Sequence, residues 1–274
     1  MPILYLVGTP IGNLEDISLR ALRILGEVGL IAAEDTRTTG RLLKHYQIET
    51  PMLSYHDYSD QGRLSQLIDA MSTNDVALVT EAGMPGLSDP GYRLVKEAIE
   101  AGIEVVPVPG PSAATAALVI SGLPTDKFLF LGFLPRQQNA RRAILNDVAL
   151  LPYTLVLYEA PHRILELLAD MRDLLGDRQL SIGRELTKLH EEIWRGHISQ
   201  AITHFSQGKI RGELTVIVAG PGEEVYRWTE SEVRESLAEQ LSKGIKRKEA
   251  AAIVAQMSGW RKKEVYELSL SQRD

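Results

Sequence analysis

Two loops rich in glycine and proline have the composition expected of a ligand-binding site. The first contains Gly8 and Gly12 and directly follows a predicted strand, Ile3–Val7. The second, Thr80–Gly91, holds three glycines and two prolines and follows another predicted strand. Glycine lets backbone approach a ligand closely, and the loops at strand ends are where open α/β sheets bind ligands. The first loop lacks the spacing of a dinucleotide fingerprint or a P-loop, so alone it fits a plain turn equally well.

These loops belong to a chain in which short apolar segments alternate with amphipathic stretches. Such alternation is typical of α/β domains with largely parallel sheets. We expect Ser112 to cap one helix and Asp89 to cap the helix that starts near Gly91. The predicted strands are Ile3–Val7, Leu30–Ala33, Val76–Thr80, Glu104–Pro107, Phe128–Gly132, Tyr153–Tyr158, Gln179–Arg184 and Glu213–Ala219. Helices are predicted near 18–25, 39–46, 91–101, 113–121, 141–148, 161–175 and 198–205, and then near 229–243, 246–258 and 261–268.

The 274 residues, 44% of them hydrophobic, exceed the usual size of one domain. We divide the chain into an α/β domain over residues 1–111, a second α/β domain over 112–222 and a basic helical extension over 223–274. The break Ser258–Trp260 suits the turn of a helix-turn-helix unit.

Several classes of protein are disfavoured by composition. No apolar run reaches the roughly 18 residues that a membrane-spanning helix needs, so we expect a cytoplasmic protein. There is no cysteine, and the six histidines show no ligand-like pairing, so no metal is predicted. The net charge of −6 argues against a protein that coats itself with nucleic acid, yet Lys243–Lys263 contains seven basic residues and one acidic residue. That segment is where a polyanion would bind.

A set of short motifs in one order along the whole chain carries a resemblance that no single motif carries. The motifs are Gly8–Asn13, Glu34–Arg37, Ser54–Asp57, Ala82–Pro85, Ser88–Gly91, Pro109–Ala113, Glu159–Arg163, Arg184–Lys188 and His190–Glu192. Through these motifs, the chain resembles the class III S-adenosylmethionine-dependent methyltransferases of tetrapyrrole-methylase type, in particular the branch that methylates small-subunit ribosomal RNA. The resemblance implies two α/β domains with the methyl donor in the cleft between them, and usually a homodimer.

The resemblance also implies which residues hold S-adenosylmethionine. Gly83, Met84 and Pro85 correspond to the Gly-Asp-Pro-like donor loop, with Met84 in place of the acid found in porphyrin-modifying relatives. The other positions that it implies for the donor site are Pro10, Leu87, Ser112, Ala113, Tyr158, Leu186 and Thr215.

Transfer of a methyl group from a sulfonium to a ribose oxygen is an in-line displacement that needs no metal. The hydroxyl must lose its proton, and a general base typically contributes about 10²–10⁴-fold. Lys188 and Glu185 share a face if their segment forms a helical turn, but Lys188 acts as a base only with a lowered pKa and otherwise holds a phosphate. A solvated ion pair is the alternative. Glu159, at the end of a predicted strand, is the third candidate; its alternative role is to stabilise the start of the next helix.

The candidate RNA contacts are basic. Lys246, Arg247, Lys248, Arg261, Lys262 and Lys263 fall at predicted helix starts, where cations oppose the helix dipole, so helix stability does not explain them. Arg37 could clamp a phosphate or form a loop ion pair with Asp35. Two roles are possible for Arg136, Arg141 and Arg142: they bind RNA phosphates at the mouth of the cleft, or they form an ordinary solvated helix face.

Three alternative functions are compatible with these features of the sequence. The first is 2′-O-methylation of a cytidine ribose in small-subunit ribosomal RNA, within an assembled or nearly assembled subunit because the basic area is small. The second is methylation of a tetrapyrrole or another non-RNA acceptor on the same scaffold. The third is a non-catalytic RNA-binding protein of ribosome assembly, which measurable donor binding would argue against.

Overall fold

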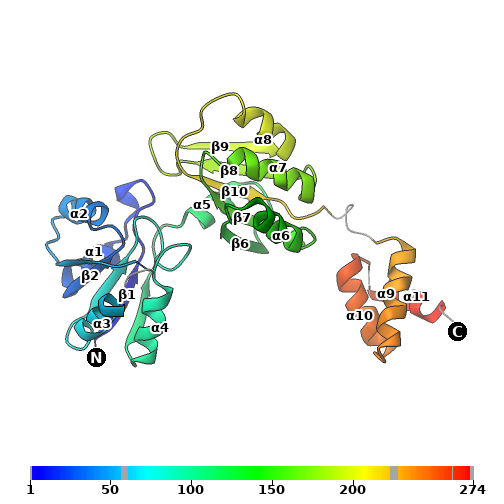
Figure 1. Cartoon of the computed structure of the whole chain (residues 1–274), viewed down its shortest axis with the longest axis horizontal. Helices are drawn as coiled ribbons and strands as arrows, with labels where there is room; N and C mark the ends of the chain where they lie inside the picture. The colour runs from blue at the N-terminus through cyan, green and yellow to red at the C-terminus, as the bar shows by residue number, and fades with distance from the viewer. Residues whose placement is uncertain (1, 57–60, 223–227, 261, 272–274) are drawn as a thin grey trace.

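The computed structural model describes residues 2–56, 61–222, 228–260 and 262–271 and contains two β-sheets followed by a group of helices (Figure 1). The first sheet and its helices are β1 (Ile3–Val7), η1 (Leu14–Asp16), α1 (Leu19–Glu27), β2 (Leu30–Ala33), α2 (Thr36–His45), β3 (Met52–Ser54), α3 (Gln61–Ala70), β4 (Val76–Val79), α4 (Tyr92–Glu100) and β5 (Glu104–Val108). The second sheet and its helices are α5 (Ala113–Ile120), β6 (Phe128–Phe133), α6 (Gln138–Val148), β7 (Thr154–Glu159), α7 (Ile164–Leu175), β8 (Gln179–Arg184), β9 (Glu192–His197), α8 (Ile198–Phe205) and β10 (Leu214–Val218).

The first sheet has the order β3-β2-β4-β1-β5, with every paired strand parallel. Helices α1 and α2 cover one face, and α3 and α4 cover the other. Strand β2 shows why both faces need cover: Ile31 and Ala33 pack with α1 and α2, whereas Ala32 packs with α3 and α4. A sheet buried on both faces favours continuous apolar strands such as β4, whose four residues are all buried.

The second sheet is mixed and has the order β6-β7-β10-β8-β9. Helices α6, α7 and α8 cover one face, and α5 covers the other. Strand β10 runs antiparallel to β7 and β8, so it starts at the edge where those two strands end. This register places Thr215 beside Tyr158. The predicted domain boundary at residue 111 falls between β5 and α5.

Most predicted elements are present within a few residues, but the short helix η1, strands β3 and β9 and helix α3 were missed. Strand β3 has three residues at a sheet edge, too few for a pattern to show. Strand β9 is also an edge strand, and its sequence, with Glu192, Arg195 and His197, is too polar to be recognised as one. Helix α3 could have been predicted, because Leu64 and Leu67 are buried at helical spacing.

The C-terminal helices form a small core of their own. Helices α9 (Glu230–Ser242), α10 (Arg247–Ser258) and α11 (Lys262–Ser271) pack around six buried side chains. Gly259 adopts a left-handed conformation, φ +67°, that ends α10, and the Trp260 indole donates to the Trp228 carbonyl at 2.6 Å. The predicted break at Ser258–Trp260 is therefore confirmed. The linker acids Glu223 and Glu224 and the candidate Arg261 lie outside the described residues. None of the helices in the described part of the chain is long and apolar enough to cross a bilayer.

Gly8→Ala should destabilise the first sheet. A Cβ at Gly8 would lie 2.7 Å from Gly110 Cα and 2.7 Å from Met84 Sδ, and the Gly110 backbone cannot yield easily. We expect a loss of about 1–3 kcal/mol in the free energy of unfolding, measured by thermal and urea denaturation. Gly26→Ala is the matched control, because a Cβ there would meet nothing within 4 Å and α1 would gain a better helix former. Equal stability of Gly8→Ala and the wild type would contradict this close packing.

Candidate active site

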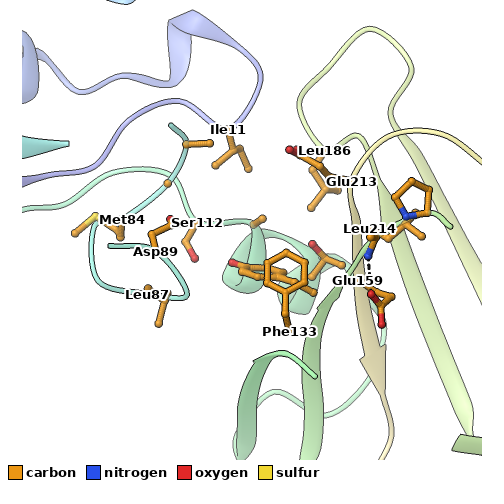
Figure 2. Close-up of a pocket in the computed structure, with 17 residues that line it drawn as sticks. Ile11, Met84, Leu87, Asp89, Ser112, Phe133, Glu159, Leu186, Glu213 and Leu214 are labelled. Atoms are coloured by element: carbon orange, nitrogen blue, oxygen red, sulfur yellow. Dashed lines mark hydrogen bonds between the residues drawn. The ribbon is translucent and has the colours of Figure 1, made fainter. Parts of the chain in front are cut away.

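A pocket of about 290 Å³ lies where the loops of the two sheets meet (Figure 2). Its first-sheet residues follow β1, β4 and β5, and its second-sheet residues come from the ends of β6, β7 and β8 and the start of β10. In Figure 2, Met84, Leu87, Asp89 and Ser112 lie to the left, and Leu186, Glu213 and Glu159 lie to the right. We call this the donor pocket, after the ligand that the sequence resemblance implies for it. It is lined by Ile11, Ala82, Gly83, Met84, Leu87, Asp89, Ser112, Ala113, Phe133, Tyr158, Glu159, Ala160, Pro161, Leu186, Glu213, Leu214 and Thr215.

Eight of the ten positions that the resemblance implied for the donor line this pocket. The exceptions are Pro85 and Pro10; Pro10 lines a neighbouring cavity instead, because the loop after β1 turns Ile11 towards the donor pocket. Sequence reasoning missed several lining residues. Ile11, Ala160 and Leu214 are chain neighbours of predicted ones, whereas Phe133, a 57% exposed aromatic at the end of β6, had no sequence signal of its own.

Ser112 occupies the N-cap position of α5, but the expected side-chain cap is wrong. The Ala114 amide donates instead to the Tyr158 hydroxyl at 3.2 Å. The Ser112 hydroxyl is buried and has no hydrogen-bond partner. A buried hydroxyl without a partner is costly, and a ligand in the pocket can satisfy it.

Asp89 does not cap α4 either, since the N-cap is Gly91 and makes no side-chain hydrogen bond. The Asp89 carboxyl therefore stands on the pocket wall, half-buried. Its burial, together with the negative charges of Glu34, Glu81 and Glu213, raises its pKa to about 7. A carboxyl with such a pKa can hold or release a proton near neutrality.

Glu159 ends β7 and is 1% exposed. Its Oε1 accepts from the Ala160 amide at 2.7 Å and lies 3.4 Å from the Arg163 guanidinium, while its Oε2 is buried without a partner. Burial raises the pKa of this carboxyl. Both contacts lie just before α7, which agrees with the alternative role of Glu159 in stabilising the start of that helix. They leave Oε2 available to bind a ligand.

Lys188 and Glu185 form the turn that the sequence suggested, with the Lys188 amide bonded to the Glu185 carbonyl at 3.0 Å. Lys188 Nζ donates to Glu185 at 2.9 Å and to Glu213 at 2.8 Å. Burial alone would lower the pKa of Lys188, but the bonds to Glu213 and Glu185 raise it. Lys188 is thus held in its charged form, which is unsuited to a base.

The remaining basic candidates fall into two groups. Arg141 is 1% exposed and bonded to Asp170 at 2.8 Å, so burial corrects its assignment as a phosphate contact. Arg142 forms ion pairs with the same Asp170 at 2.8 Å and with Asp173 at 3.0 Å, so its guanidinium is less available to bind RNA. Arg37, 86% exposed, pairs with Asp35, the N-cap of α2. Exposed residues without such pairing are Arg136, Lys246, Arg247, Lys248, Lys262 and Lys263.

The described residues contain no group of three or more His, Asp or Glu side chains that could hold a metal ion. The site instead offers a largely apolar, partly open pocket with a few convergent polar atoms. Such a pocket suits an organic ligand of moderate size.

Comparison with known proteins defines the class to which this fold and pocket belong. Residues 3–202 match the family model described as Tetrapyrrole (Corrin/Porphyrin) Methylases. Among solved structures, the methyltransferase CobJ shares the fold, with a TM-score of 0.61 at 18% identity over 80% of this chain and 95% of that one. A uroporphyrin-III-C-methyltransferase from Thermus thermophilus does so with a TM-score of 0.54 at 21% identity, over 79% of this chain and 94% of that one.

Closer relatives narrow the class. The chain is 45% identical to a protein named Ribosomal RNA small subunit methyltransferase I from Synechocystis, over 98% of both chains. Proteins of the same name are 42% identical in Bacillus subtilis, over 97% of this chain and 94% of that one, and 49% identical in Thermotoga maritima, over 79% and 98%. The chain therefore belongs to the tetrapyrrole methylase family and, within it, to the ribosomal RNA small subunit methyltransferase I family. It is a methyltransferase.

Asp89→Asn should stabilise the protein in a pH-dependent way. An unfolded aspartate has a pKa of about 3.9, so a folded pKa of about 7 means that the fold loses stability as pH rises from about 4 to about 7. Asparagine removes this loss. We expect Asp89→Asn to melt above the wild type at pH 8, with the difference shrinking towards pH 4. Asp147→Asn, on the exposed side of α6, controls for loss of a carboxylate. A difference that is constant with pH would contradict the raised pKa.

Proposed function

We propose that this methyltransferase transfers a methyl group from S-adenosylmethionine to the 2′-oxygen of a cytidine ribose in small-subunit ribosomal RNA. The observation that carries the proposal is the 45% identity, over 98% of both chains, to a relative whose name gives small-subunit ribosomal RNA as the substrate. The cytidine ribose is the finer part of the proposal and comes from the resemblance. Because the identity extends over so much of the chain, it includes both sheets and reaches into the helical extension. A ribosomal acceptor would place the reaction in the cytoplasm, and we retain the homodimer as part of the proposal.

The donor pocket fits S-adenosylmethionine chemically. The adenosine and the methionine chain present apolar surface to Ile11, Leu186 and Phe133. Their hydroxyl and amino groups can satisfy the unpartnered Ser112 hydroxyl and Glu159 Oε2. The sulfonium and the α-ammonium are cationic, and the Glu159 carboxyl on the pocket wall can balance such a charge. As the resemblance implies, Tyr158, Leu186 and Thr215 would flank the adenosine.

S-adenosylmethionine supplies an electrophilic methyl group on a sulfonium. As the methyl–oxygen bond forms and the carbon–sulfur bond breaks, the 2′-hydroxyl proton must leave. We assign the acceptance of that proton to Asp89, whose pKa of about 7 suits a base at neutral pH. Lys188, held charged, would bind the RNA backbone, and Glu185 would fix its position. Glu159 would bind the donor rather than take the proton.

Contacts to the rest of the RNA are proposed for the exposed basic side chains. Lys246, Arg247 and Lys248 lie at the start of α10, and Lys262 and Lys263 lie at the start of α11. All five are exposed and none forms an ion pair within the described chain. Counterion release on phosphate binding would make their contribution depend strongly on salt. Arg37 and Arg136 would add contacts nearer the donor pocket.

Ser112→Ala should weaken donor binding without destabilising the fold. The Ser112 hydroxyl makes no hydrogen bond of normal length within the protein, although it lies close enough to the Tyr158 hydroxyl to lower the pKa of that group. The main loss is therefore the bond to the ligand. We expect the dissociation constant for S-adenosylmethionine, measured by calorimetry, to rise about 3- to 10-fold. Ser121→Ala is the matched control: its hydroxyl donates to the Leu118 carbonyl at 2.7 Å, so the variant should lose stability and keep donor affinity. Unchanged donor affinity in Ser112→Ala would argue against a role for this hydroxyl.

The activity itself is tested with small ribosomal subunits that lack the modification. Incubation with radiolabelled S-adenosylmethionine should label the subunit RNA, and mapping should locate the label on a cytidine ribose oxygen. Naked RNA and a porphyrin precursor are assayed alongside. Asp89→Asn should bind the donor and transfer about 10²-fold or more slowly. Label only on the porphyrin would favour the second function, and donor binding with no transfer to RNA would reject the proposed acceptor.

A further inference from the structure

A second cavity, of about 460 Å³, adjoins the donor pocket, and we call it the adjoining cavity. It lies at the carboxyl ends of β1 and β4, beside the first turns of α2, and Lys188 and Glu213 close it from the second sheet. Its volume is within the range of about 300–1,000 Å³ that is typical of small-molecule sites. It is lined by Thr9, Pro10, Ile11, Gly12, Leu14, Thr38, Thr39, Arg41, Leu42, Thr80, Glu81, Ala82, Lys188 and Glu213.

The two cavities share a wall of three residues, Ile11, Ala82 and Glu213. A methyl group can be transferred only when the acceptor atom approaches it to about 3–3.5 Å, so the acceptor must reach the donor pocket across such a wall. The adjoining cavity is therefore in the right place for the acceptor.

The polar groups of the cavity differ from those of the donor pocket. Arg41, exposed on α2, has no hydrogen bond or ion pair within the described residues. Lys188 enters from the opposite side, fixed by Glu213 at 2.8 Å. The Thr80 side chain, 1% exposed, has a buried hydroxyl that lies beside the Asp89 carboxyl and lowers its pKa. The free guanidinium of Arg41, the paired ammonium of Lys188 and the carboxylates of Glu81 and Glu213 thus surround the same space.

This set of groups suits one nucleotide better than a polycarboxylate. A tetrapyrrole carries several carboxylates, but Lys188 is already paired with Glu213, so only Arg41 among the described cations of the cavity is free to bind one, and Glu81 would repel the others. A nucleotide has one phosphate for a guanidinium and, in cytidine, an amino group and ribose hydroxyls that donate to carboxylates. Arg37 precedes Arg41 by four residues on α2, so the two lie on one face of the helix and can contact successive phosphates of a strand.

We propose that the adjoining cavity receives the single unstacked nucleotide that is methylated, with its phosphate on Arg41 and its sugar at the wall formed by Ile11, Ala82 and Glu213. The inference rests on the proposed function and adds an acceptor site and a phosphate anchor that the sequence analysis did not identify. The unstacking is required because a cavity of about 460 Å³ has room for a nucleotide but not for a helical stem.

Arg41→Ala tests the anchor on the full chain with unmodified small subunits. Loss of a charged hydrogen bond to phosphate should lower kcat/KM for the subunit about 10- to 100-fold. The dissociation constant for S-adenosylmethionine should stay within twofold. Arg41→Lys keeps the charge but loses the forked donors of the guanidinium, so its kcat/KM should lie between those of the wild type and Arg41→Ala. Arg20→Ala is the matched control: Arg20 is exposed on α1, lines neither cavity and has no ion pair within the described residues.

A binding measurement separates this inference from the proposed function. Calorimetry with cytidine 3′,5′-bisphosphate, in the presence of S-adenosylhomocysteine, should show binding to the wild type and to Arg20→Ala, and at least tenfold weaker binding to Arg41→Ala. Equal affinity in all three proteins, or equal loss of donor affinity in Arg41→Ala, would overturn the acceptor site even if the wild type methylates subunits. Failure of the wild type to methylate any RNA, with the bisphosphate still bound through Arg41, would overturn the proposed function alone.

Discussion

The donor pocket depends on how closely three strand ends of the first sheet are packed together. Gly8 and Gly110 face each other with no room for a Cβ, and the Thr9 and Gly83 amides donate to each other's carbonyls at 2.9 and 3.1 Å. The loops after β1, β4 and β5 are thereby joined into one rigid surface. Every other part of the site, including the second sheet's contribution, is built against this surface.

The second sheet meets that surface through a strained turn. Glu185 and Thr187 adopt positive φ angles of 50° and 65°, which cost about 1–3 kcal/mol each in residues other than glycine. The Lys188 ion pairs and the bond from the Thr187 amide to Glu191 at 2.6 Å hold the turn in place. Gly12 lacks a side chain where this turn approaches, since a Cβ would lie 2.9 Å from Thr187 Oγ1. The strain positions Leu186 in the donor pocket and Lys188 in the adjoining cavity.

Polar groups in the site are left incompletely satisfied by the protein, and this fits a site that is completed by ligands. The hydroxyl of Ser112 and one oxygen of Glu159 are buried without partners. Each costs free energy in the empty site, and each can be satisfied when a ligand binds. The donor pocket and the adjoining cavity also differ in chemistry. The donor pocket is largely apolar and holds the polar groups proposed to bind the donor, whereas the adjoining cavity holds the free guanidinium of Arg41.

The sequence by itself determined the two α/β halves and the helical extension, because strand and helix periodicity is a local signal. Eight of the residues that line the donor pocket were implied by the resemblance of the sequence to the family. Only the tertiary structure decided which polar side chains are free. Arg141 is buried and paired with Asp170. The Ala114 amide at the start of α5 donates to the Tyr158 hydroxyl and not to Ser112. Lys188 is held by Glu213, which is 25 residues away in the chain. Such pairings join residues distant in the chain, so they follow from how the sheets pack and not from any spacing along the sequence.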